Sequence, residues 1–334
     1  MSASKKRTLD AFFSPAPKRN KAGEEEEAAA ASDDEGAAVV VSSHANYPFS
    51  IADLPVSLSV GMASVPARPS RSVNDQPDLD LVYFEPYIPT RVARELFNFL
   101  RAELPFYRVE YDIKRKGVQT HVRTPRWTTV FGLDDTCYFG DDGCPLEKST
   151  NLPVHDKRYI AVPPRPIPEC LDRLRTSVES ATGCCFNFCL VNYYASGSDS
   201  IAFHSDDERF LGKDPAIASI SLGARRDFLL KYKPPQTSQP SLQPVAPPMR
   251  NLTELRFPLG SGDMMLMRGR TQSSWLHSIP KRTGKNQEDG GRINITFRRA
   301  MIKEGTVNYY RYNVGTGPVY RWDRDSRQMT PWKS

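Results

Sequence analysis

The sequence contains no apolar run of membrane-spanning length, and its first residues, Met1-Ser2-Ala3-Ser4-Lys5-Lys6-Arg7, lack the apolar core of a secretory signal. Cysteine is scarce, and no internal repeat is present. The six cysteines show neither the paired spacing of a zinc site nor the density of a secreted disulfide scaffold. We therefore expect a soluble intracellular protein whose thiols are reduced and mostly buried.

The composition predicts a folded protein with one sizeable core and tails. The chain has 334 residues, of which 39% are hydrophobic and four are Trp. Residues 1–45 hold six Lys and Arg against eight Asp and Glu, so the rest of the chain carries 39 basic and 31 acidic residues. That surplus is compatible with a polyanionic partner, and equally with a surface whose cations only keep the protein in solution.

Three segments differ in texture along the chain. Residues 1–45 contain the acidic run Glu24-Glu25-Glu26-Glu27 and an alanine stretch, and we expect a disordered tail there. Residues 46–80 are rich in Ser, Pro and Ala and are interpreted as a linker. A folded domain is expected over 81–334, with its core at about 186–302 and an unstructured Pro-rich insertion at 233–250.

The folded segment alternates helical and strand patterns. Apolar residues recur at helical spacing from Thr90 to Leu104 and from Pro168 to Thr182, with Gly183 as a C-terminal stop. Eight short strands separated by turn residues predict a double-stranded β-helix, or jelly roll, so the fold class is mainly β with flanking helices (α+β). The expected strands are Phe186–Tyr194, Ile201–His204, Ala216–Leu222, Phe228–Tyr232, Glu254–Phe257, Asp263–Met267, Trp275–Ser278 and Arg292–Arg298.

His204, Asp206 and His277 have the spacing of an iron-binding facial triad. Two imidazoles and one carboxylate can occupy one face of an Fe(II) octahedron and leave three positions open for a co-substrate and O2. His204 and Asp206 face the same side at strand period, while His277 comes from a much later strand, as the mouth of a barrel requires.

The strand Arg292–Arg298 follows the second histidine. Its alternation directs Arg292, Asn294, Thr296 and Arg298 to one side and the apolar residues to the other. Two guanidiniums beside an open metal suit a dicarboxylate such as 2-oxoglutarate.

Several segments together resemble the AlkB family of Fe(II)/2-oxoglutarate dioxygenases, and most of all its eukaryotic nuclear members that repair alkylated DNA. The resemblance covers roughly residues 81–302. It rests on Asn192-Tyr193-Tyr194, His204-Ser205-Asp206-Asp207-Glu208-Arg209, the run from Ile217 to Phe228, Trp275-Leu276-His277-Ser278-Ile279-Pro280 and Arg292-Ile293-Asn294-Ile295-Thr296-Phe297-Arg298.

The resemblance implies a set of roles for these residues. His204, Asp206 and His277 would ligate iron, while 2-oxoglutarate would be held by Asn192, Tyr194, Arg292, Asn294 and Arg298. Which arginine meets which carboxylate stays open. The implied reaction is oxidative demethylation of N1-methyladenine and N3-methylcytosine in DNA, with O2 consumed and formaldehyde and succinate released.

A methylated base must leave the duplex to reach a recessed metal, so the site needs aromatic faces and a polar contact to the base edge. We expect Tyr138 and Phe139 to supply the faces and Glu208 the edge contact. The segment from Lys114 to Arg126 is loosely similar to the base-flipping hairpin of relatives that act on duplex DNA, and Arg123 and Arg126 could contact phosphates.

This hairpin segment leaves the strand preference open. It has no large aromatic residue at the expected position of an intercalating wedge, only Gln119, Thr120 and His121. Demethylation of RNA or of single strands alone is therefore a second hypothesis. A catalytically dead nucleic-acid-binding module is a third, against which the intact triad argues.

The tail carries two short motifs. Lys6-Arg7-Thr8-Leu9-Asp10-Ala11-Phe12-Phe13 resembles a peptide that binds the sliding clamp PCNA, with Leu9, Phe12 and Phe13 spaced to enter one apolar pocket. Lys5-Lys6-Arg7 and Lys18-Arg19-Asn20-Lys21 are typical of a bipartite nuclear import signal. We expect a nuclear, monomeric enzyme that binds the clamp through this tail.

Overall fold

The computed structural model describes residues 40–334, apart from 116, 155–158, 160–161, 234–253, 285–289, 304, 316 and 334. One compact unit comprises Val39–Ser334. The motifs at Leu9, Phe12 and Phe13, nearly all of the expected tail and nearly all of the 233–250 insertion lie outside the described residues. No helix in the described part of the chain has both the length and the apolar content to span a membrane.

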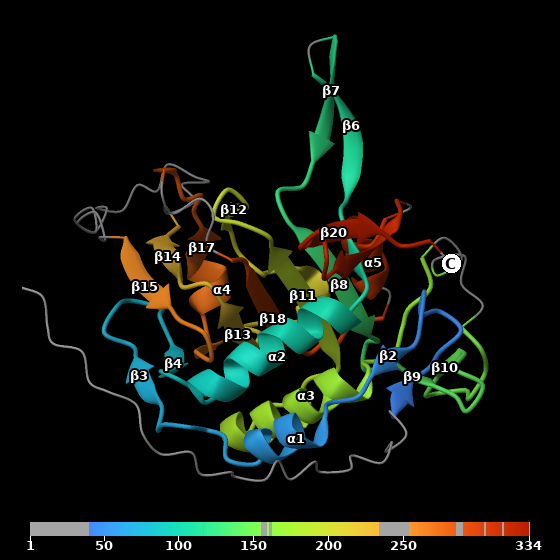
Figure 1. Ribbon diagram of the computed structural model, residues 1–334. Coiled ribbons are helices and arrows are strands. Elements are labelled where there is room, and N and C mark those ends of the chain that lie inside the picture. Colours follow the sequence, from blue (N-terminus) through green and yellow to red (C-terminus); the bar gives the residue numbers. More distant parts are fainter. Residues whose placement is uncertain are drawn as a thin grey trace, which may run out of the picture. The chain divides into compact units, whose positions relative to one another are not determined.

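Two facing sheets form the core of this unit (Figure 1). The larger sheet has ten strands, in the spatial order β20 (Gln328–Pro331), β19 (Val319–Asp323), β5 (Phe106–Tyr107), β8 (Trp127–Gly132), β11 (Phe188–Tyr194), β18 (Arg292–Arg298), β13 (Ile217–Gly223), β16 (Met264–Met267), β4 (Leu81–Phe84) and β3 (Arg71–Val73). The smaller sheet has four strands, in the order β12 (Ile201–His204), β17 (Trp275–Ile279), β14 (Arg226–Tyr232) and β15 (Leu255–Leu259).

The chain passes back and forth between the sheets, which makes the fold a jelly roll. Strands β11, β13, β16 and β18 belong to the larger sheet, whereas β12, β14, β15 and β17 belong to the smaller one. These are the eight strands that the sequence predicts, each with its ends within two residues of the expected ones. The expected fold class is therefore confirmed.

Strand β18 has the two different faces that its alternating apolar and polar residues predict. All seven of its residues are buried, because both faces of the larger sheet are covered. Ile293, Ile295 and Phe297 join the apolar core on the helical side of the sheet. The alternate residues face the space between the two sheets, where they line a cavity: Arg292, Asn294, Thr296 and Arg298.

Helices cover the outer face of the larger sheet (Figure 1): α1 (Val56–Met62), α2 (Thr90–Glu103) and α3 (Glu169–Thr182). The helices predicted from Thr90 and from Pro168 are both present. Leu96 and Leu100 of α2 and Leu174 of α3 are buried in the core beneath them. Gly183 ends α3 in the left-handed region, with φ of 69°, as its C-terminal position predicts.

The segment expected as a linker contains regular structure. Within residues 46–80 lie α1, β3 and strand β2 (Ile51–Ala52), which pairs with β1 (Val41–Ser42) inside the expected tail. Ile51, Leu54 and Leu58 are buried in the helical core. The Ser and Pro content of the segment hides these three apolar residues, which pack into the same core as residues of α2 and α3.

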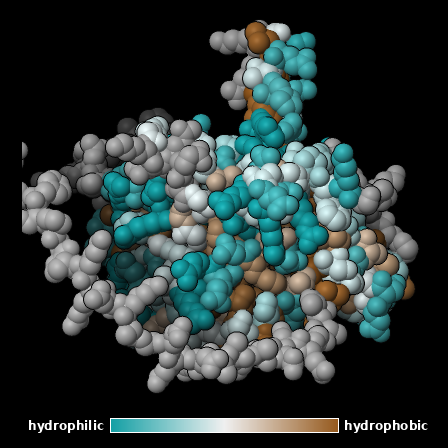
Figure 2. Space-filling view, viewed as in Figure 1, coloured by the Kyte–Doolittle hydropathy of each residue, from teal (hydrophilic) through white to brown (hydrophobic). Residues whose placement is uncertain are grey.

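Two hairpins extend from the body. Strands β6 (Glu110–Arg115) and β7 (Val118–Arg123) form a two-stranded ribbon that projects away from both sheets (Figures 1 and 2). Strands β9 (Cys137–Phe139) and β10 (Pro145–Glu147) form the other hairpin. Three short helices complete the described elements: η2 (Arg209–Leu211), α4 (Thr271–Ser274) and α5 (Gly305–Asn313).

All six cysteines have free thiols, as expected. Cys137, Cys170 and Cys189 are buried and Cys184 is half-buried, but Cys144 and Cys185 are exposed. The expectation of mostly buried thiols therefore holds for half of them. Burial raises the pKa of the Cys137 thiol, which makes a thiolate less accessible there.

Candidate active site

Strand pairing brings the three predicted metal ligands together. Strands β12 and β17 are antiparallel neighbours, and His204 lies directly opposite His277 in their register. Asp206 follows just past the end of β12. The possible ligand atoms of the three residues all lie within 4.8 Å of one another. Nε2 of His277 is 3.7 Å from one carboxylate oxygen of Asp206, and Nε2 of His204 is 3.9 Å from the other.

Hydrogen bonding prepares His204 as a metal ligand. Its Nδ1 lies 2.9 Å from the carbonyl oxygen of Ala202. A carbonyl only accepts, so Nδ1 carries the proton and Nε2 presents its lone pair toward Asp206. The backbone N–H of Asp206 donates to Oε1 of Gln272 at 2.9 Å, which fixes the chain where the carboxylate enters the site.

Burial sets the charge state of the other two groups. Burial lowers the pKa of His277 to about 3, so its imidazole is neutral at physiological pH. The ring of Phe228 stacks on it, with centroids 5.3 Å apart. Burial alone would raise the pKa of Asp206, but the Arg298 guanidinium holds it below its usual value. A neutral imidazole and an ionised carboxylate are the forms that bind a divalent metal, so the donor set fits Fe(II).

The predicted co-substrate residues line a single cavity of about 490 Å³ beside the triad. Arg298 lies at one end of β18, with Nη2 3.0 Å from the Asp206 carboxylate. Arg292 lies at the other end, where it donates to the Ser221 hydroxyl at 2.8 Å. Burial would lower the pKa of Arg298, but Asp206 raises it, so the guanidinium stays charged. The cavity also contains Asn192, Tyr194 and Asn294.

The cavity is therefore chemically suited to a dicarboxylate. Nε of Arg298 is buried and has no hydrogen-bond partner among the described residues. An unpaired donor of this kind costs free energy unless a ligand accepts from it. The side-chain amide nitrogen of Asn294 already has partners, because it donates to the Ser219 hydroxyl at 2.9 Å and to the Ile220 carbonyl at 3.0 Å. Asn192 is held by Arg126, whose Nε donates to its side-chain oxygen at 3.0 Å.

Two of the five predicted substrate contacts line this cavity: Glu208 and Arg126. Burial raises the pKa of Glu208, and Oε2 of this carboxyl is buried without a partner among the described residues. Arg123 lies instead on β7, where it pairs with Glu110 at 2.7 Å and is half exposed.

Tyr138 and Phe139 do not line the cavity, so the structure does not bring these two predicted aromatic faces together with Glu208 and Arg126. They belong to β9, on the opposite side of the unit from β12 and β17 (Figure 1). The Tyr138 hydroxyl donates to Asn151 at 3.1 Å, and the Phe139 ring lies 5.6 Å from that of His44. An aromatic pair before glycine serves hairpin packing here.

Helix α5 contributes a wall of the cavity that the sequence interpretation missed. Its cavity-lining residues fall on one helical face at spacings of three and four: Gly305, Asn308, Tyr309, Tyr312 and Asn313. Tyr309 is hydrogen-bonded to the guanidinium of Arg298 through its hydroxyl. The spacing could have revealed this face, but its residues are polar, so a search for apolar periodicity passes over it.

The jelly roll and its site define the class of protein. A model of the 2OG-Fe(II) oxygenase superfamily matches residues 80–298, so the chain belongs to that superfamily and is a dioxygenase. The family's description contains both the metal and the co-substrate that the triad and the arginine strand predict.

Curated relatives agree with the resemblance to AlkB. DNA oxidative demethylase ALKBH2 of Arabidopsis thaliana is 31% identical over 229 residues, which are 66% of this chain and 67% of the relative. ALKBH2 of Homo sapiens is 36% identical over 143 residues, 43% of this chain and 51% of the relative. Alpha-ketoglutarate-dependent dioxygenase alkB homolog 3 of Homo sapiens is 38% identical over 128 residues, 38% of this chain and 41% of the relative.

The chain thus spans between about two fifths and two thirds of the length of these relatives. A solved structure of OsALKBH1 covers 68% of this chain at 16% identity, with a TM-score of 0.37, too low a likeness to carry a conclusion.

Proposed function

We propose that this chain oxidatively demethylates N-alkylated bases in DNA, with Fe(II), 2-oxoglutarate and O2, and so repairs alkylation damage. The observation that carries the proposal is the triad with Arg298 against its buried carboxylate, inside a cavity that also holds a second arginine. The relatives named as DNA oxidative demethylases supply the substrate class. The bases proposed are N1-methyladenine and N3-methylcytosine, and the products are formaldehyde and succinate.

The residues of the cavity divide into two groups by position. His204, Asp206 and His277 would hold iron, and Arg298 keeps the buried carboxylate ionised and oriented. When bound, iron and 2-oxoglutarate together activate O2 for attack on a C–H bond. The protein's own work is to exclude water, to fix the co-substrate and to hold the methyl group near the metal.

The two arginines suggest an orientation for 2-oxoglutarate. Arg298 contacts Asp206, so it would meet the carboxylate at the metal end. Arg292 lies six residues away at the other end of β18, beside Tyr194, whose ring centre is 5.4 Å from its guanidinium carbon. Arg292 would therefore bind the distal carboxylate, with Asn192, Tyr194 and Asn294 lining the path between the two.

Glu208 and Arg126 are proposed to meet the substrate. Glu208 enters the cavity two residues after Asp206, and its buried oxygen without a partner is free to receive an N–H from a base edge. Arg126 lies in the same cavity, and Arg123 lies on the β7 strand of the projecting hairpin, where cations can contact phosphates.

Mass spectrometry of defined oligonucleotides tests the proposal. The full chain would be incubated with Fe(II), 2-oxoglutarate, ascorbate and strands that carry one N1-methyladenine or N3-methylcytosine. We expect loss of one methyl group per strand and formation of succinate. His204→Ala should abolish both, while His44→Ala, a histidine outside the cavity that contacts the Gly143 carbonyl, should change neither. Equal products from the His204→Ala variant would contradict the proposal.

A preference for single strands or RNA is the second candidate. The exposed apolar residue near the tip of the projecting hairpin is Val118, a side chain smaller than an aromatic wedge. Tyr111, half exposed, lies at the second position of β6 instead. Turnover of matched duplex, single-stranded DNA and RNA strands with the same methylated base decides between the candidates. Faster turnover of single strands or RNA than of the duplex supports the second candidate, and equal turnover contradicts it.

We further propose that the N-terminal tail directs the enzyme to the nucleus and to the PCNA clamp. The support is the sequence alone, with Leu9, Phe12 and Phe13 in the clamp-binding pattern. Replacing Phe12 and Phe13 by Ala in the full chain should abolish binding to the purified clamp, measured by calorimetry, and leave demethylation unchanged. Unaltered clamp binding would refute the assignment.

A further inference from the structure

Helix α5 lies outside the segment that matches the superfamily, yet it forms one wall of the active-site cavity. The match ends at Arg298, and α5 begins at Gly305. Its cavity-facing residues run from the metal region to the mouth, because they follow one another along a single helical face: Gly305, Asn308, Tyr309, Tyr312 and Asn313. The chain therefore builds this wall from residues of its own C-terminal extension.

The opposite face of α5 fixes the helix to the larger sheet. Thr306 and Tyr310 are fully buried. The Tyr310 hydroxyl donates to the Gly132 carbonyl at 2.8 Å, and the Thr128 hydroxyl donates to the Asn313 carbonyl at 2.5 Å. Each of these two hydrogen bonds joins a residue of α5 to a residue of β8, and α5 lies beside β8 in Figure 1. A helix held in this way presents its other face at a defined position.

The start of α5 also packs closely against the segment that follows Asp206. A Cβ atom on Gly305 would lie 1.7 Å from Cβ of Phe210, so only glycine allows this approach. Phe210 belongs to η2, four residues after Asp206. Further along, Tyr309 is hydrogen-bonded to Arg298, the cation that contacts Asp206. The register of α5 is thus tied to the triad from two sides.

The outer end of this face carries a tyrosine in an unusual setting. Tyr312 lines the cavity, although 70% of its surface is exposed to solvent. Its ring therefore stands at the mouth. Asn308 is exposed one turn earlier on the same face, and Arg209 is exposed on the η2 side of the cavity. An aromatic face, an amide and a cation around one opening are groups that can bind the base, the sugar and the phosphate of a nucleotide.

We propose that Tyr312 is a substrate-binding residue on which a nucleobase stacks as it enters the cavity, with α5 as the wall that positions it. The assignment rests on the proposed function, since the cavity must take a nucleotide for a base to reach Tyr312. It adds a substrate contact from a segment beyond the superfamily match. Tyr309 is a positioning residue in this arrangement, because it acts through Arg298.

Two substitutions of Tyr312 test the proposal in the full chain. Tyr312→Ala removes the ring, and Tyr312→Phe keeps the ring and removes only the hydroxyl. We expect Tyr312→Ala to weaken binding of a methylated single strand, measured by fluorescence anisotropy, about tenfold, and to raise KM by the same factor with kcat nearly unchanged. Tyr312→Phe should keep both values within about twofold of the unaltered protein.

Controls separate substrate contact from damage to the site. Succinate formed from 2-oxoglutarate without oligonucleotide should be equal in all forms, since Tyr312 does not touch the triad. Trp332→Ala, an exposed aromatic of the same C-terminal segment that packs on Phe49 outside the cavity, should bind the strand normally. Equal anisotropy and KM for Tyr312→Ala and the unaltered protein would overturn the assignment.

The same experiment distinguishes a failure of the proposed function. If the unaltered chain binds the strand but removes no methyl group, demethylation is wrong, and the anisotropy comparison still decides whether Tyr312 contacts the base. If the chain demethylates and Tyr312→Ala behaves normally, only the assignment of Tyr312 is wrong. Absence of any strand binding by the unaltered chain would contradict both.

Discussion

The contact between Arg298 and Asp206 has two consequences at the scale of single residues. Both side chains are almost completely buried, and the guanidinium lies 3.0 Å from the carboxylate. The pair keeps Asp206 ionised for metal binding, because the cation offsets the effect of burial on its pKa. It also means that neither charge can be removed alone without leaving the other buried and uncompensated.

We therefore expect Arg298→Met to lower the free energy of unfolding by about 3–5 kcal/mol, since it leaves the buried Asp206 carboxylate without its cation. Urea unfolding of the metal-free protein measures this difference. Arg91→Met is the matched control, because Arg91 pairs with Glu95 at 3.1 Å on the exposed face of α2. That substitution should cost less than about 0.5 kcal/mol. Equal losses in the two variants would mean that the Arg298 contact contributes nothing beyond a surface ion pair.

The residues of the site could be predicted where strand geometry dictates them. His204, His277 and the polar residues of β18 follow from a period of two and from pairing between distant strands, and Asp206 comes just past the end of β12. Tyr138 and Phe139 could not be placed, because no local pattern distinguishes an aromatic that packs a hairpin from one that faces a cavity. The local sequence predicts which side of its strand a side chain faces. It does not predict which other strand or cavity lies on that side.

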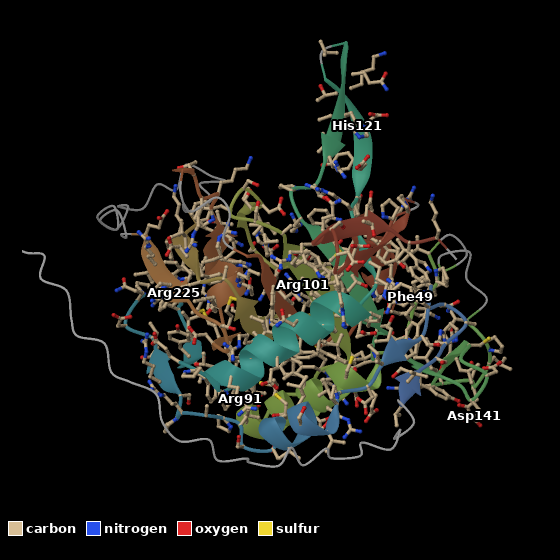
Figure 3. The ribbon with its side chains drawn as sticks, in the orientation of Figure 1. Phe49, Arg91, Arg101, His121, Asp141 and Arg225 are labelled. Atoms are coloured by element: carbon tan, nitrogen blue, oxygen red, sulfur yellow. The ribbon has the colours of Figure 1, made fainter. Side chains whose placement is uncertain are left out.

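At the scale of elements, the β6–β7 hairpin carries a charged cluster on one face. Asp112 lies opposite His121 in the strand register, and Glu110 lies opposite Arg123. The His121 ring is 3.0 Å from Asp112 and 3.2 Å from Glu110. Figure 3 labels His121 on this projecting ribbon, far from Asp141 near β9. Hydrogen bonds to Asp112 and Glu110 raise the pKa of His121.

The sign of this shift predicts how the hairpin responds to pH. A raised pKa means that the charged cluster stabilises the hairpin fully below the ordinary histidine pKa of about 6.5, and that this contribution disappears as pH rises through the higher folded value. Titration of His121 by NMR should give a midpoint above about 6.5. Asp112→Asn should move the midpoint down, and Asp141→Asn should leave it unchanged. A midpoint insensitive to Asp112→Asn would contradict the assigned cause.

Elements differed in how well the sequence predicted them, for a physical reason. Helix α2 and the eight jelly-roll strands have one apolar face against a core, and their periodicity follows from that contact. Helix α5 instead turns polar residues toward a cavity and buries only Thr306 and Tyr310. A helix that turns polar residues toward a cavity has no apolar period, so a search for apolar periodicity does not predict it.

At the scale of the whole molecule, the superfamily segment is extended at both ends. Residues before 80 add α1, β2 and β3, which cover the helical side and one edge of the larger sheet. Residues after 298 add α5 to the cavity and β19 and β20 to the other edge. The extensions protect sheet edges that would otherwise present unpaired backbone groups. They are part of the folded unit rather than appendages to it.

This integration makes a prediction about truncation. A chain that begins at Val39 keeps the compact unit whole, so its free energy of unfolding should match that of the full chain within about 0.5 kcal/mol. A chain that begins at Leu81 loses Ile51, Leu54 and Leu58 from the core and exposes the edge of β4. Each buried apolar side chain contributes about 1.5–3 kcal/mol, so the loss is a large part of a typical total of about 5–15 kcal/mol.

Urea midpoints of the two truncated chains measure the difference. Equal midpoints would mean that residues 46–80 behave as the linker that their composition suggests, and that their burial against α2 and α3 contributes no net stability.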